Sequence, residues 1–123
     1  MIRIVGIQRH VETCKEFVLL QNQGALRVEL KGHALLAQHA TDSGELAQLL
    51  HVFSDEVDVQ PGMYVLLRTC SGVGHWNCTH DRYNTYYSYM HRASGVWARI
   101  PGPIQLLSPQ HSYIEREKAV ALV

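Results

Sequence analysis

Residues 57–70 (VDVQPGMYVLLRTC) constrain the fold more than any other part of the chain. Apolar residues recur at every second position both before and after Pro61-Gly62. A period of two is typical of half-buried strands, because successive side chains of a strand point to opposite faces. Proline presets φ and glycine accepts a positive φ. The segment therefore predicts two strands joined by a turn, as a central hairpin.

Short strands are predicted along the rest of the chain as well. Residues 16–20 are nearly continuously apolar, which is typical of a central strand, whereas residues 26–31 alternate cleanly. Weaker strand patterns mark residues 1–7, 33–37, 45–53, 83–90, 95–100 and 104–107, and in residues 45–53 the leucine spacing also fits a helix. Roughly eight to ten short strands predict an all-β, antiparallel sandwich with one long loop or excursion over about residues 71–92.

Length and charge limit the functional classes. The 123 residues are expected to form a single domain, 1–123, and 11 basic residues balance 11 acidic ones. Zero net charge argues against a dedicated nucleic-acid-binding protein. We see no apolar run of the length of a signal peptide core or a membrane span, so the expected location is cytoplasmic. Three cysteines, Cys14, Cys70 and Cys78, would then stay reduced.

The order of features resembles the lamin-tail domain. EFVLLQNQGALRVELKGHALL (residues 16–36) is similar to its opening strand, Asn-containing turn and Leu-x-Gly, and residues 52–67 are similar to its next part. Val96-Trp97 and Ile104-x-Leu106 are similar to its closing section. The resemblance implies an immunoglobulin-like β-sandwich that is not an enzyme and acts as an interaction or scaffold module. The apolar residues 119–123 would allow a homodimer.

Tyrosine and arginine are concentrated in residues 82–92, with Trp76 shortly before them. Tyrosine offers rigid contact area at low entropic cost, and tyrosine with arginine is typical of binding hot spots. We therefore expect Trp76, Tyr83, Tyr86 and Arg92 to contact an unidentified protein partner. Two alternatives are a half-buried strand of the sandwich, and weak binding of single-stranded nucleic acid by base stacking between the flanking arginines.

Four residues with metal-ligand chemistry, Cys70, His75, Cys78 and His80, lie in one short stretch. Thiolate sulfur and imidazole nitrogen suit tetrahedral zinc, so a zinc-stabilised domain is the alternative to a protein without a cofactor. A Cys70–Cys78 disulfide, or a buried Cys70 with exposed histidines, accounts for the same residues without metal. The sequence places neither a base nor an oxyanion site near Cys78, so we expect no catalytic residues.

Overall fold

The computed structural model describes residues 1–38, 49–78, 84–100 and 102–109, and these contain ten strands in three sheets. The five-stranded sheet has the order β1 (Ile2–Gln8), β2 (Phe17–Asn22), β7 (Tyr64–Arg68), β9 (Asn84–Tyr89), β8 (His75–Cys78). The three-stranded sheet has the order β10 (Ile104–Leu107), β4 (Ala34–Ala37), β5 (Leu50–Val52), and β3 (Val28–Glu29) pairs with β6 (Asp58–Val59). Within these ranges no helix has the length and apolar character needed to cross a membrane.

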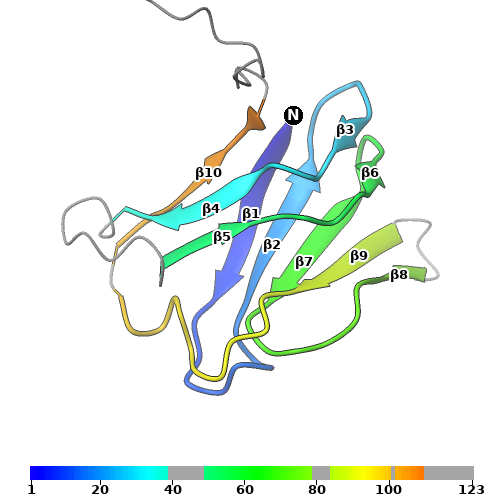
Figure 1. The fold of residues 1–123 in the computed structure, drawn as a ribbon. Coiled ribbons are helices and arrows are strands. Elements are labelled where there is room, and N and C mark those ends of the chain that lie inside the picture. Colours follow the sequence, from blue (N-terminus) through cyan, green and yellow to red (C-terminus); the bar gives the residue numbers. More distant parts are fainter. Residues whose placement is uncertain (39–48, 79–83, 101, 110–123) are drawn as a thin grey trace, which may run out of the picture.

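The three-stranded sheet lies across one face of the five-stranded sheet (Figure 1), and side chains from both form one hydrophobic core. In β2 and β7, buried positions alternate with half-buried ones along the whole strand. Leu20 and Leu67 are fully buried on the inner face, and Leu35 of β4 enters the core from the opposite sheet. The expected all-β architecture and the period of two in residues 63–67 are therefore confirmed.

The turn at Pro61-Gly62 is confirmed, but the central hairpin is wrong. Gly62 has a φ of 85°, and the Met63 N–H donates to the Gln60 carbonyl at 3.0 Å. β6 then pairs with β3, whereas β7 pairs with β2 and β9. The Gly62 N–H donates to the backbone carbonyl of the buried Asn22 at 2.8 Å, which anchors the turn to the end of β2. The two strands therefore separate into different sheets.

The expected long loop over residues 71–92 contains two strands at the edge of the five-stranded sheet. β8 is antiparallel to β9, and β9 is parallel to β7. The expectation of a wholly antiparallel sheet is therefore wrong at the β7–β9 pair. The chain leaves β7, forms the outer strand β8 and then returns as β9, which lies between them (Figure 1). The strand expected at residues 83–90 is confirmed as β9.

Residues 95–100 do not form the expected strand but a series of turns and bends. The backbone N–H groups of Val96, Trp97 and Ala98 donate to the carboxylate of Glu16 instead of to a neighbouring strand. Trp97, 1% exposed, fills the core at this point. The strand expected at residues 45–53 is confirmed only over β5, because Leu49 is helical. Residues 39–48 and the apolar residues 119–123 lie outside the described ranges.

Candidate binding surface on the outer sheet face

The three expected contact residues that the structure describes, Trp76, Tyr86 and Arg92, do not share one surface. Trp76 on β8 is 40% exposed, and its ring meets the ring of Tyr86 edge-on at 5.3 Å. Tyr86 is 8% exposed, and its hydroxyl donates to Asp55 Oδ2 at 2.9 Å. Arg92 is half-buried and donates to a backbone carbonyl of β5 at 3.5 Å. Tyr83 lies outside the described residues. Trp76 is thus the exposed candidate, and Tyr86 supports it from the core side.

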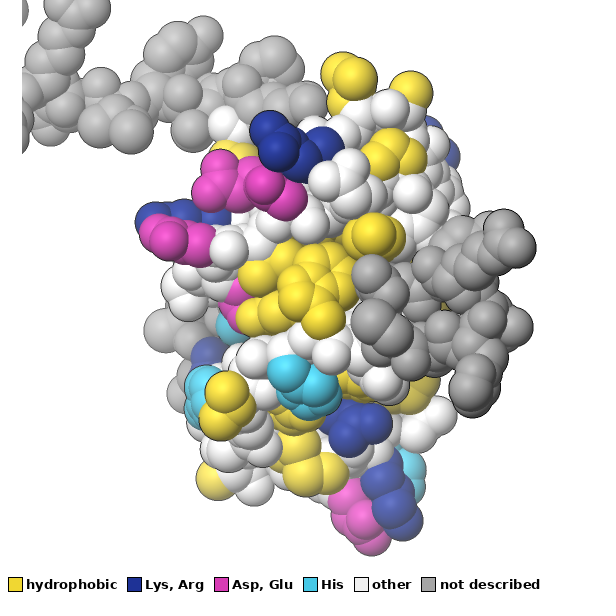
Figure 2. Space-filling view, turned by 90° about the vertical axis from the view of Figure 1, so that its right-hand side faces the viewer, with side chains coloured by type: hydrophobic (Ala, Val, Ile, Leu, Met, Phe, Trp, Pro, Cys, Tyr) yellow, Lys and Arg dark blue, Asp and Glu magenta, His cyan; other side chains and the backbone are white. Residues whose placement is uncertain are grey.

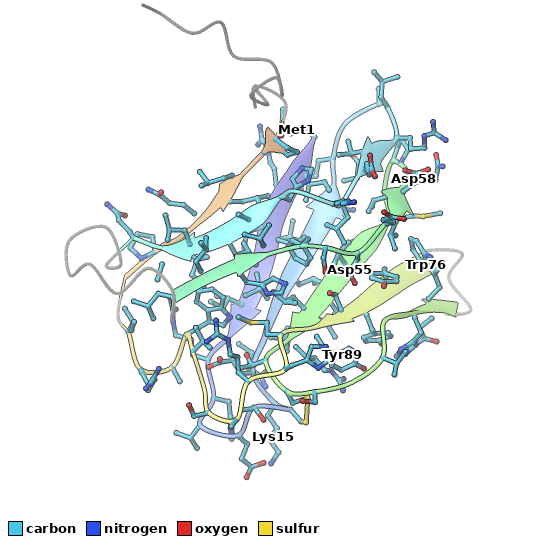
Figure 3. The ribbon with its side chains drawn as sticks, in the orientation of Figure 1. Met1, Lys15, Asp55, Asp58, Trp76 and Tyr89 are labelled. Atoms are coloured by element: carbon cyan, nitrogen blue, oxygen red, sulfur yellow. A yellow bond between two sulfur atoms is a disulfide. The ribbon has the colours of Figure 1, made fainter. Side chains whose placement is uncertain are left out.

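Asp55 fixes the inner side of β9. It accepts hydrogen bonds from Tyr86 and, at 3.1 and 3.2 Å, from the hydroxyl of the buried Ser88. Burial, together with the bond to Asp55, raises the pKa of Tyr86 to about 12, so this hydroxyl remains a donor at neutral pH. Figure 3 shows Asp55 and Trp76 close to β9 at the sheet edge. This polar cluster holds β9 in its position between β7 and β8.

The outer side of β7, β9 and β8 carries four stacked side chains, which we call the ladder: Arg68, Tyr87, His75 and Tyr89. The Arg68 Cζ atom lies 5.5 Å from the centre of the Tyr87 ring. The His75 ring stacks on Tyr87 at 4.9 Å and 26°, and its centre lies 6.3 Å from that of Tyr89 at 25°. Stacking of this kind fixes the side chains before any partner binds.

Two hydrogen bonds hold the ladder from the side. The Asn77 amide donates to the Tyr87 hydroxyl at 3.2 Å, and His75 Nδ1 lies 2.8 Å from the Val73 carbonyl. Figure 2 views the molecule from the side on which β8 and β9 form the sheet edge, and hydrophobic side chains gather there with histidine, basic and acidic side chains around them. The ladder is therefore a preformed aromatic surface rather than a set of mobile loop residues.

Strand register extends the ladder into a row across the sheet. Residues that lie opposite one another on successive strands are Gly6, Leu19, Leu66, Tyr87 and His75. The two leucines of this row are half-buried, in contrast to their fully buried neighbours in the same strands. The outer face thus has an apolar centre that water still reaches, which is the composition of many interaction surfaces.

The structure uses Cys70 in a way that the sequence did not suggest. Cys70 forms a disulfide with Cys14, with Cα atoms 4.9 Å apart and a sequence separation of 56. Phe17 lies opposite Arg68 in antiparallel register, so the chain segments beyond them come together at the same sheet end. The expectation of reduced cysteines is therefore wrong for this pair, and so is the alternative disulfide between Cys70 and Cys78.

The structure describes the side chains of two of the four expected zinc ligands, Cys70 and His75. Cys70 is bonded to Cys14, and the His75 ring belongs to the ladder. Within the described ranges no three His, Cys, Asp or Glu side chains are grouped to hold a metal ion. His80 and the side chain of Cys78 lie outside this description. A zinc site stays a prediction for a form of the protein in which Cys70 is reduced.

Sequence reasoning missed Glu16, a fully buried carboxylate at the start of β2. Oε1 accepts hydrogen bonds from Thr69 Oγ1 at 2.8 Å and from the N–H groups of Val96 and Trp97 at 2.8 and 3.1 Å. Oε2 accepts from the N–H groups of Ala98 and His10 at 2.9 and 3.3 Å. Converging donors of this kind offset the cost of burying a charge. The available signal was an acidic residue at the start of an apolar run.

His51 makes the stability of the fold pH-dependent. Burial lowers the pKa of its imidazole from 6.5 to about 4; Asp55 opposes this shift, and Arg92 and His91 add to it. In the described structure, the buried Nε2 atom has no hydrogen-bond partner. Between pH 6.5 and pH 4 the unfolded chain binds a proton that the folded chain does not. The free energy of unfolding therefore decreases as the pH is lowered through this window.

We expect His51 to account for a loss of about 2–3 kcal/mol between pH 7 and pH 4.5. Urea unfolding at the two pH values measures it, and the loss should shrink by that amount in His51→Gln, whose side chain does not titrate. Burial also lowers the pKa of His33, so a smaller loss should remain in the variant. An unchanged loss in His51→Gln would contradict the assignment.

No protein-family model, curated protein or solved structure matches this chain. The function is therefore inferred from the geometry of the surface described above.

Proposed function

We propose that the chain is a non-enzymatic binding module that holds a protein partner on the ladder side of the five-stranded sheet and around its β8 edge, where Trp76 lies on the opposite side of β8 from His75. The ladder carries this proposal. Its rings are stacked on one another, and those of Tyr87 and Tyr89 are still partly exposed. Rigid aromatic side chains beside an arginine are typical of interface hot spots, and groups that are ordered in advance lose little entropy on binding.

The proposal includes a single lamin-tail-like domain with an immunoglobulin-like sandwich. It is supported by two sheets that share one core and by strands of two to seven residues. The Cys14–Cys70 disulfide is typical of oxidising compartments, which counts against the cytoplasmic location expected from the sequence.

Selection from a random-peptide display library tests the binding surface. We expect peptides that bind the wild-type protein and lose about tenfold or more in affinity in Tyr87→Ala and Trp76→Ala, as hot-spot residues do. Leu26→Ala is the matched control, because Leu26 is a large apolar side chain, 78% exposed, in the loop between β2 and β3. It should bind like the wild type.

Two results would contradict the proposal. In the first, the selected peptides bind Tyr87→Ala, Trp76→Ala and Leu26→Ala equally well. In the second, peptides do not bind but a single-stranded oligonucleotide does, with a strong dependence on salt and a loss in Tyr87→Ala. That second result would favour the nucleic-acid alternative.

A further inference from the structure

Arg68 is a half-buried cation in the middle of the outer sheet face. Its position on β7 places it between Phe17 of β2 and Tyr89 of β9. Within the described residues, no carboxylate lies within 4.0 Å of its guanidinium group. In contrast, Lys15, Arg27 and Lys31 each form an ion pair with a carboxylate at the surface. The contact of Arg68 is the face of the Tyr87 ring.

The surroundings of Arg68 favour negative charge. None of the strand residues that alternation and register place on this face is acidic: Arg3, Gly6, Gln8, Phe17, Leu19, Gln21, Tyr64, Leu66, Arg68, Thr85, Tyr87, Tyr89, His75 and Asn77. Arg3 is exposed and adds a second positive charge. The described strand residues of this face thus carry a net positive charge, although the whole chain has a net charge of zero. Charge complementarity of this kind selects partners and raises association rates.

Within the described residues, the Arg68 guanidinium lies over the Tyr87 ring and has no carboxylate partner. Its five N–H donors lie in the plane of the group, and contact with an aromatic ring does not satisfy them as a carboxylate does. A carboxylate can accept two of these N–H groups in parallel, which is a strong and directional interaction. Because neighbouring side chains already exclude part of the water, such a pair would be stronger here than at a fully exposed site.

We propose that the partner presents an acidic segment to this face, with an Asp or Glu carboxylate on the Arg68 guanidinium and an apolar side chain on Leu19 and Leu66. This inference rests on the proposed function, because it names the chemistry of the partner that the ladder binds. Leu19 and Leu66 lie opposite each other, and Leu66 is two residues before Arg68 on the same face of β7. An extended segment that crosses the strands would therefore meet a cation and an apolar pair together.

The peptide selection described above also tests the partner's charge. We expect Asp and Glu to be enriched several-fold among the selected peptides relative to the unselected library. A representative synthetic peptide should bind Arg68→Glu about tenfold or more weakly than the wild type, and its binding should weaken as salt screens the charges. Arg99→Glu is the matched control, since Arg99 is exposed and the change in net charge is the same. It should bind within about twofold of the wild type.

Arg68→Gln is the second variant, in case Arg68→Glu does not fold, because it removes the charge and keeps hydrogen-bonding ability. It should also lose affinity for the acidic peptide. Peptides that depend on Tyr87 but are not enriched in acidic residues, and that bind Arg68→Gln like the wild type, would overturn this inference and leave the proposed function standing. Peptides that depend on neither Tyr87 nor Trp76 would overturn both. An oligonucleotide that outcompetes the acidic peptide would assign Arg68 to a phosphate and also overturn it.

Discussion

Replacing Glu16 with glutamine is expected to lower the free energy of unfolding by about 3–5 kcal/mol. The reason is that both carboxylate oxygens accept hydrogen bonds from buried or partly buried donors. A glutamine keeps one oxygen and turns the other position into an N–H donor that faces other donors. Even in its better orientation, with the amide nitrogen at the Oε2 position, the N–H groups of Ala98 and His10 lose their acceptor. Each buried donor left unsatisfied costs about 1–3 kcal/mol.

Urea or thermal unfolding of Glu16→Gln measures this effect. Glu12→Gln is the control, because Glu12 lies in the same chain segment and forms an exposed ion pair with Lys15. Its loss should stay below about 1 kcal/mol, as for most surface ion pairs. Equal stability of the two variants would mean that the hydrogen bonds to Glu16 do not hold residues 95–98 in place.

Removing the Cys14–Cys70 disulfide by Cys14→Ser is expected to lower the free energy of unfolding by about 4 kcal/mol. The bond closes a loop of 56 residues, and a cross-link of that span removes much of the conformational freedom of the unfolded chain. Cys14 is exposed, so the serine hydroxyl is not buried, and the loss should come from the cross-link itself.

Unfolding of the wild type with and without reductant gives a matched comparison. Reductant should destabilise the wild type by the same amount and leave Cys14→Ser unchanged. The denatured wild type should show one reactive thiol per chain before reduction and three after it, since the sequence has three cysteines. Three thiols without reductant would show that the disulfide is absent in the purified protein, and would reopen the zinc hypothesis.

Much of the fold was predictable because its signals are local. The alternation in β7, the apolar run of β2 and the Pro61-Gly62 turn each lie within a few residues, and the structure shows all three. Pairing was less predictable. The separation of β6 from β7 depends on Asn22, which lies 37 residues before Val59. The side-chain amide of Asn22 donates a hydrogen bond to the Val59 carbonyl at 2.8 Å.

The candidate surface was predicted in part. The aromatic composition of residues 82–92 indicated a binding surface at β8 and β9, but composition does not say which side of a strand faces water. Tyr86 is held inward by Asp55, 31 residues away, and this contact turns Tyr87 and Tyr89 outward. Arg68 was not predicted as a contact residue, because its β7 neighbours are apolar and its ring partner, Tyr87, belongs to a different strand.

The secondary structure class and the buried sides of the main strands follow from the amino-acid sequence alone, because hydrophobic periodicity is a pattern among residues close in the chain. Tertiary structure decided the strand order, the disulfide, the role of Glu16 and the composition of the ladder. Four of the five donors to Glu16 come from residues 53 to 82 positions away. Contacts between residues so far apart in the sequence depend on how the sheets pack, and a pattern within a few residues does not predict them.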